Sequence, residues 1–280
     1  MNIPVLACLL AVAAAAFVAV AVERVGAIGR PATELFAAEH GVAPTPEGLE
    51  LCRRYLSRAR QFRFIGSFAG LLLGIVLTQT VGINLITIVP GWFVGVIAAE
   101  LFRLRARNRS SAQRTASLEL RTASRYVPRR LAWHSRALAA ATVAVAIAGL
   151  VMPWPSEHTA LLAWSISSVA IFGIAELSQR AIAARTRPAL PPAIEQADDT
   201  IRRVGAMAVG YAASATLAVL FGLVCIAGRG SGTAPANLSG TMTVVGLGAI
   251  LWGIALAVVE HRFFWPTVRA AGRARPAANS

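Results

Sequence analysis

The sequence predicts an all-α protein, a polytopic transmembrane helical bundle of about seven spans with its N-terminus outside and its C-terminus in the cytoplasm. Of its 280 residues 56% are hydrophobic and only 14% are charged, whereas ordinary soluble domains carry about 25% charged residues. The apolar residues form long blocks, and the basic residues lie between these blocks. This distribution favours lipid over water as the solvent for most of the chain.

Seven apolar blocks approach the roughly 20 residues that a helix needs to cross a hydrocarbon core of about 30 Å. The first block is followed, not preceded, by its first arginine, Arg24, an order that favours a retained span over a cleaved signal peptide. We expect residues 1–260 to form a single transmembrane domain and residues 261–280 to form a disordered, basic cytoplasmic tail. The predicted spans are 3–22, 64–80, 83–101, 137–152, 160–177, 204–227 and 242–260.

The distribution of basic residues supports the number of spans independently of hydropathy. All 27 cationic residues are arginine, and 26 of them lie after the first, third, fifth or seventh block; the remaining one, Arg229, follows the sixth. Cytoplasmic loops carry the excess of basic residues, so these four segments are predicted to be inside. We expect the arginines to contact anionic headgroups at the cytoplasmic face of a bacterial plasma membrane, and we expect no nucleic-acid binding.

The segment between the first two blocks contains helix signals. Thr45 and Pro46 have the residue types of an N-cap and a first helical position. The apolar residues that follow recur at helical spacing among arginines, which predicts an amphipathic helix on the inner membrane surface that runs into the block 64–80. The apolar positions of this helix are Leu49, Cys52, Leu56 and Ala59.

This segment resembles the first cytoplasmic loop of multi-pass membrane proteins from high-GC bacteria, whose activity is not established. The resemblance covers a small part of the chain. It implies a bacterial plasma membrane and no particular activity, and it assigns no functional residue. The stretches that carry it are Pro31-Ala32-Thr33-Glu34-Leu35, His40-Gly41, Thr45-Pro46 and Arg54-Tyr55-Leu56-Ser57-Arg58-Ala59-Arg60.

Small residues recur every fourth position in several blocks. Such stripes let helix backbones approach each other closely within lipid, where apolar burial no longer drives association. They predict packing within one chain, and the stripe in the block 64–80 leaves homo-oligomerisation open as an alternative. The positions are Gly66, Gly70 and Gly74; Gly91 and Gly95; Ala206, Gly210 and Ser214; and Ala249, Gly253 and Ala257.

The last six blocks form three similar hairpins, each ending at a glutamate, and the likeness is either a true repeat or a result of composition. The glutamates are Glu100, Glu176 and Glu260, and each has an arginine within about one helical turn: Arg103, Arg180 and Arg262. We expect ion pairs at the membrane surface. The alternative is a convergent acidic cluster that binds a cation or a partner.

Pro90 and Gly91 lie near the middle of the block 83–101. Proline removes a helix hydrogen bond, so a kink or a break is expected there. Broken helices can build transport sites. The polar partners near this point are Asn84 and Thr87 alone, which favours a structural kink.

The residue inventory argues against most catalytic and cofactor chemistry. The chain contains no lysine, which excludes a P-loop lysine and a retinal Schiff base. The histidines lack the spacing of metal ligands, and no GxSxG motif is present. We therefore expect no cofactor, no metal and no enzymatic activity. Two hypotheses remain: a non-catalytic scaffold or regulatory component of a membrane complex, and a transporter or channel subunit built from the three hairpins.

Overall fold

The computed structural model describes residues 21–78, 81–108, 123–151, 158–185, 192–228 and 236–264. Within these ranges the secondary structure is entirely helical, which confirms the all-α class. Most of the predicted span 3–22 and residues 265–280 of the predicted tail lie outside the described ranges. Residues 261–264 continue a helix, so the predicted tail begins in helical structure.

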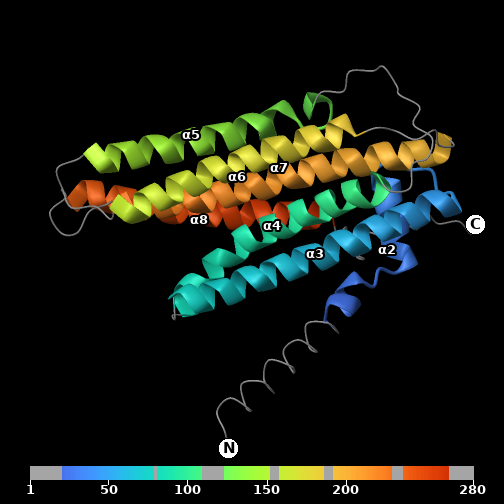
Figure 1. Cartoon of the computed structure of the whole chain (residues 1–280), viewed down its shortest axis with the longest axis horizontal. Coiled ribbons are helices and arrows are strands. Elements are labelled where there is room, and N and C mark those ends of the chain that lie inside the picture. Colours follow the sequence, from blue (N-terminus) through green and yellow to red (C-terminus); the bar gives the residue numbers. More distant parts are fainter. Residues whose placement is uncertain are drawn as a thin grey trace, which may run out of the picture.

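Six long helices lie alongside one another, with a short helix packed at one end (Figure 1). A single 3₁₀ turn precedes the third long helix. In chain order the elements are α2 (Arg30–Glu39), α3 (Pro46–Thr78), α4 (Val81–Asn108), η1 (Ala123–Arg125), α5 (Arg129–Val151), α6 (His158–Ala184), α7 (Pro192–Gly228) and α8 (Ala236–Phe264).

Four helices in the described part of the chain are long and apolar enough to cross a membrane, so the structure supports a membrane protein. They contain most of the predicted blocks 137–152, 160–177, 204–227 and 242–260. The helices α3 and α4 contain most of the other two blocks that fall on described residues. The four candidate spans are Arg129–Val151, His158–Ala184, Ile194–Gly228 and Asn237–Glu260.

Local sequence signals set the ends of α2 and the start of α3. Gly41 adopts a positive φ of 67° directly after α2, a conformation that glycine tolerates without a steric penalty. Thr45 caps α3 as predicted, because the Gly48 N–H donates a hydrogen bond of 3.2 Å to its hydroxyl oxygen. The helix then runs for 33 residues without interruption.

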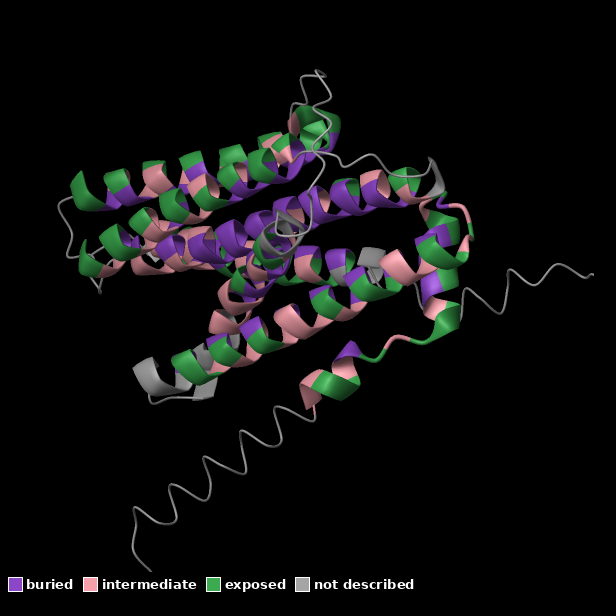
Figure 2. Cartoon of the chain, turned by 45° about the vertical axis from the view of Figure 1, so that its right-hand side comes forward, coloured by how far each residue is buried: buried purple, intermediate pink, exposed green. Residues whose placement is uncertain are grey.

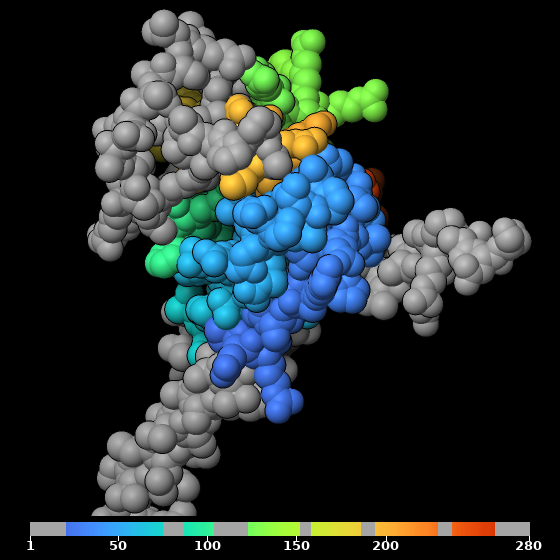
Figure 3. Space-filling model, turned by 90° about the vertical axis from the view of Figure 1, so that its right-hand side faces the viewer, coloured from blue at the N-terminus to red at the C-terminus, as the bar shows by residue number. Residues whose placement is uncertain are grey.

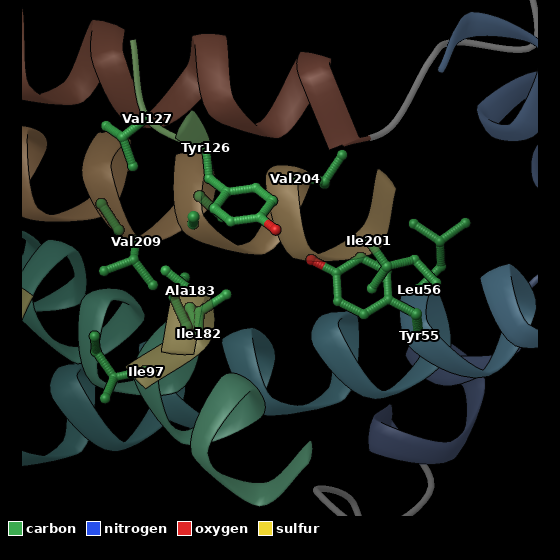
Figure 4. Close-up of a cluster of buried hydrophobic side chains, with 14 of the residues drawn as sticks. Tyr55, Leu56, Ile97, Tyr126, Val127, Ile182, Ala183, Ile201, Val204 and Val209 are labelled. Atoms are coloured by element: carbon green, nitrogen blue, oxygen red, sulfur yellow. The ribbon is translucent and has the colours of Figure 1, made fainter. Parts of the chain in front are cut away.

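The apolar face at the start of α3 is buried in the protein, so its predicted position on the membrane surface is wrong. Cys52, Leu56 and Ala59 are at most 2% exposed, and Leu49 is half-buried. Cys52 and Leu56 belong to a core cluster that includes residues of α2 and α7, and Figure 4 shows Leu56 beside Ile201. The turn after α2 and the length of α7 bring both helices onto this face. Burial raises the pKa of the Cys52 thiol to about 11.

Helix α7 is the centre of the bundle. Its most apolar stretch is 78% buried, against 17–28% for the other three candidate spans. It contacts α3, α4, α5, α6 and α8, and Figure 2 shows buried residues concentrated along it while the outer helices carry many exposed ones. Small side chains allow this enclosure because they let five neighbours approach one backbone. Those at most 1% exposed include Ala206, Ala208, Ala212, Ala213, Ser214, Ala215, Thr216 and Ala218.

The outer helices expose large apolar side chains along their length. Val151 of α5, Ile166 of α6 and Val244 of α8 are each more than 60% exposed. Contiguous apolar surface of this kind is rare on soluble monomers. It fits helices that contact lipid acyl chains on their outward faces.

Glycines bring α3 and α4 into backbone contact. A Cβ atom at Gly66 would lie 2.7 Å from the Cα of Gly95, and one at Gly91 would lie 2.7 Å from the Cα of Gly70. Gly74 is buried on the same helix. The stripe that could have served homo-oligomerisation therefore contacts α4 of the same chain along Gly66 and Gly70.

Glycines also bring the backbones of α7 and α8 into contact. A Cβ atom at Gly253 would lie 2.6 Å from the carbonyl oxygen of Ala215, and one at Gly246 would lie 2.8 Å from that of Gly222. The remaining positions of the small-residue stripes lie on the same two helices: Ala206, Gly210 and Ser214 of α7 are buried, and Ala249 and Ala257 of α8 are half-buried.

Helix α4 continues through Pro90 and Gly91 without a break. Pro90 is half-buried, while Gly91 contacts α3. The Thr87 hydroxyl donates a hydrogen bond of 2.7 Å to the Gly70 carbonyl oxygen. The polar side chain nearest the proline thus joins two helices.

Replacing Gly91 with alanine is expected to destabilise the protein by about 1–3 kcal/mol, because the new methyl group would force the α3 and α4 backbones apart. Thermal unfolding of the detergent-solubilised protein, followed by circular dichroism, measures the effect. Gly248→Ala is the matched control, because a Cβ atom at Gly248 meets nothing within 4 Å. Alanine should leave stability unchanged there or raise it by about 0.5–1 kcal/mol. Equal effects at the two sites would contradict the backbone contact.

Candidate functional site

Buried ionisable residues gather where α3 and α7 begin and where α4, α6 and α8 end. We call this group the ionic cluster. In Figure 1 the hairpin of α3 and α4 meets the other helices at this end of the molecule. The cluster consists of Tyr55, Arg63, Glu100, Arg103, Arg185, Asp198, Arg202 and Glu260.

Asp198 of α7 is the centre of the cluster. Its side chain is 1% exposed and pairs with arginines from α4, from α7 and from the position directly after α6. Arg103 of α4 donates a hydrogen bond of 3.2 Å to Oδ1, and Arg202 of α7 donates one of 2.9 Å to Oδ2. Arg185, directly after α6, lies 3.9 Å from Oδ1. One carboxylate therefore holds the ends of α4 and α6 against α7.

Arg202 has no exposed surface, and its side chain contacts both its own helix, α7, and the end of α6. Besides its contact with Asp198, its Nη1 donates a hydrogen bond of 2.6 Å to the Arg185 carbonyl oxygen. This carbonyl follows the last turn of α6, where carbonyl groups lack partners within the helix. Arg202 thus caps α6 while it pairs with α7.

Glu100 at the end of the apolar part of α4 rests against α7. A Cβ atom at Gly205 would lie 2.8 Å from its carboxyl carbon and oxygens, so a larger residue there would displace the carboxylate. Arg103 lies 3.7 Å from the Glu100 carboxylate and 5.2 Å from the centre of the Tyr55 ring. Burial, and then the Glu100 carboxylate, raise the pKa of the Tyr55 hydroxyl well above its ordinary value.

Glu260 of α8 pairs with Arg63 of α3 at 2.7 Å, and both side chains are at most 8% exposed. A buried pair of this kind holds together two helices that are distant in sequence. The predicted neighbour, Arg262, lies beyond the residues whose side chains are described. Removal of either member would leave an uncompensated buried charge.

The predicted pairs of Glu176 with Arg180 and of Glu100 with Arg103 are present, but the predicted surface position is wrong for Glu100 and Glu260. Glu176 pairs with Arg136 of α5 at 3.1 Å and with Arg180 at 3.5 Å in a partly exposed position. Glu100 and Glu260 are buried between helices. The reason is tertiary: α7 covers the first and α3 covers the second, whereas Glu176 lies on the outer side of the bundle.

Sequence reasoning missed Asp198 and Arg202 because the sixth apolar block was placed from residue 204 onward. The helix begins at Pro192 instead. A signal was present: Ala197 and Ile201 have helical spacing and are fully buried, and Asp198 stands four residues before Arg202. An oppositely charged pair at this spacing supports a helix, so the pattern could have extended the block toward its true start.

The chemistry of the ionic cluster suits a structural role, in which ion pairs hold the ends of helices together. The Asp198 and Glu260 carboxylates are occupied by guanidinium groups. Arginine stays protonated at physiological pH, so it supplies a permanent charge rather than a transferable proton. Within the described ranges no group of three histidine, cysteine, aspartate or glutamate side chains could hold a metal ion.

Two clefts flank α2 near the cluster. The first, of about 410 Å³, lies between α2 and the start of α3, and its charged residues pair with one another: Arg30 with Glu34, and Arg53 with Glu50. The Arg53 hydrogen bond is the main cause that lowers the pKa of Glu50 to about 2. The second, of about 540 Å³, lies between the end of α2 and α7.

Comparisons of this chain with protein-family models, with curated proteins and with solved structures give no match. The geometry described above is therefore the basis for assigning a function.

Replacing Asp198 with asparagine is expected to cost about 3–5 kcal/mol of stability, because it leaves the fully buried Arg202 without its counter-charge and Arg103 with Glu100 alone. Chemical unfolding of the detergent-solubilised protein measures the loss. Glu34→Gln is the matched control, since its pair with Arg30 is exposed and should contribute at most about 1 kcal/mol. If both variants unfold alike, Asp198 does not hold the helix ends together.

Proposed function

We propose that the chain is a seven-span integral membrane protein of a bacterial plasma membrane and acts as a non-catalytic scaffold or regulatory component of a membrane complex. The N-terminus is outside, and the arginine-rich end of the bundle is in the cytoplasm. Four helices that can cross a membrane support this proposal, and so do the long, largely apolar helices α3 and α4. The orientation follows from the distribution of the arginines.

The closed packing around α7 is the observation that carries the scaffold role. A solute pathway requires polar groups along a span, whereas the centre of this bundle contains an alanine-rich helix in contact with five neighbours. Of the polar side chains on its apolar stretch, Thr216 donates a hydrogen bond of 2.9 Å to the Ala212 carbonyl oxygen of the same helix. The buried charges lie at one end and pair with one another.

The cytoplasmic end offers exposed basic side chains for a partner. Arg129 and Arg130 at the start of α5 are exposed and form no ion pair with other described residues. A membrane partner with an acidic cytoplasmic segment would complement this surface. The rigid bundle would then position that segment relative to the membrane.

Reporter fusions test the topology. Fusions at Ser110 and at Thr233 should report opposite sides of the membrane, with Ser110 inside, because arginines surround the first position and only Arg229 is near the second. A fusion at Ser280 should report the same side as Ser110. Placement of Ser110 and Thr233 on one side would overturn both the number of spans and the orientation.

Purification in a mild detergent tests the scaffold role. We expect a stoichiometric membrane partner whose recovery falls in the double variant Arg129→Gln, Arg130→Gln and persists in Arg30→Gln, an exposed arginine already paired with Glu34. Proteoliposomes that contain the chain alone should show no solute flux above that of empty vesicles. Flux by the isolated chain would establish the alternative, a transporter or channel subunit.

A further inference from the structure

The cleft between the end of α2 and α7 has the features of a ligand site. It measures about 540 Å³ and is lined by Glu39, His40, Gly41, Thr200, Arg203, Val204 and Met207. It lies at the end of the molecule that Figure 3 faces, where α2 and the start of α3 lie beside the start of α7. The Gln196 side chain donates a hydrogen bond of 2.7 Å to the Gly41 carbonyl oxygen, which ties the end of α2 to α7.

The α7 side of the cleft favours an anion. Arg203 is exposed and forms no ion pair with any described residue, in contrast to its neighbour Arg202, which is fully buried and paired. The Thr200 hydroxyl lies one helical turn before Arg203 and lines the same cleft. A guanidinium group and a hydroxyl can together bind phosphate oxygens through charge-assisted hydrogen bonds.

The α2 side of the cleft favours a cation. Glu39 is exposed and lies at the C-terminal end of α2, where the helix dipole is negative. The His40 ring hydrogen-bonds through Nδ1 to the Phe36 carbonyl oxygen at 2.9 Å. A carbonyl oxygen can only accept, so Nδ1 carries the proton. Glu39 and Arg203 line one cleft without forming an ion pair with each other.

An apolar stripe leads from the cleft along α7 toward the centre of the span. Val204 forms a buried part of the lining, and Met207 and Tyr211 are half-buried at four-residue spacing after Arg203. The cleft therefore combines an anion-binding side, a cation-binding side and an apolar part of its lining, Val204 and Met207. A free ion would satisfy only one of these three features, whereas a zwitterionic amphiphile satisfies all of them.

We propose that this cleft binds the headgroup of a phospholipid that carries both a phosphate and a primary ammonium group, as phosphatidylethanolamine does. The phosphate binds at Arg203 and Thr200, the ammonium group binds at Glu39, and the start of an acyl chain contacts Met207. This inference rests on the membrane embedding in the proposed function but requires no partner protein. The cleft between α2 and α3 is a weaker candidate for a ligand site, because its charged side chains already pair with one another.

Native mass spectrometry of the full chain in detergent, titrated with phosphatidylethanolamine, tests the inference. The wild-type protein should bind one lipid, and Arg203→Gln should weaken binding about tenfold, the effect of losing one charge-assisted hydrogen bond. Arg24→Gln is the matched control, because Arg24 is also exposed and without an ion pair among described residues but lies outside the cleft. Equal weakening by both variants would overturn the site in favour of general charge attraction.

Two further titrations identify the ligand chemistry. Glu39→Gln should weaken phosphatidylethanolamine about tenfold while leaving phosphatidylglycerol, which lacks the ammonium group, unchanged. Inorganic phosphate should bind far more weakly than the lipid. Comparable binding of inorganic phosphate, or an unchanged lipid preference in Glu39→Gln, would overturn the zwitterionic site. Thermal unfolding of each variant confirms that it is folded. These titrations contain no partner protein, so a negative result would overturn the lipid site without affecting the scaffold role, which the purification experiment tests.

Discussion

The enclosure of α7 is the constraint on which the rest of the structure depends. Five helices contact one central helix, and this arrangement requires side chains small enough for backbones to approach. The alanine-rich stretch from Ala206 to Ala218 meets that requirement. Because α7 uses its surface to pack against neighbours, the outward faces of α5, α6 and α8 are left for large apolar side chains and for lipid.

Helix α7 is buried even near its start, so the charged side chains there require partners of opposite charge. Asp198 and Arg202 lie on this initial part of α7 and pair with each other, and the other guanidinium groups that face Asp198 come from α4 and from Arg185, directly after α6. Glu260 and Arg63 join α8 to α3 at the same end. Glycine contacts therefore join α3 to α4 and α7 to α8, whereas ion pairs at the arginine-rich end join α3 to α8 and α4 to α7.

The two clefts beside α2 differ in a way that matters for function. Ion pairs within one cleft satisfy its charges, so an incoming ligand would have to displace them. In the other, Glu39 and Arg203 remain apart on opposite sides, at the start of an apolar stripe. A membrane protein whose partner presents a cytoplasmic segment could use such a site to fix the position of α2 relative to the lipid headgroups.

Several features could be predicted from particular residues. Thr45 and Pro46 started α3 as expected, and the glycines at Gly66 and Gly91 occupy helix contacts of the kind that their spacing predicts. The apolar face that contains Cys52 and Leu56 was found correctly, but its partner was not: periodicity identifies which face is buried without showing what covers it. The start of α7 was missed because hydropathy alone treats a buried aspartate as a loop residue.

The sequence by itself determined the all-α class, the apolar blocks and the concentration of arginine between them, because these depend on composition and on the local repeat of a helix. Only the tertiary structure decided that α7 is central, that Glu100 and Glu260 are buried while Glu176 is not, and that Asp198 binds arginines from three parts of the chain. Such outcomes depend on which helices become neighbours, and contacts between residues as distant as Arg103 and Asp198 leave no local periodic pattern.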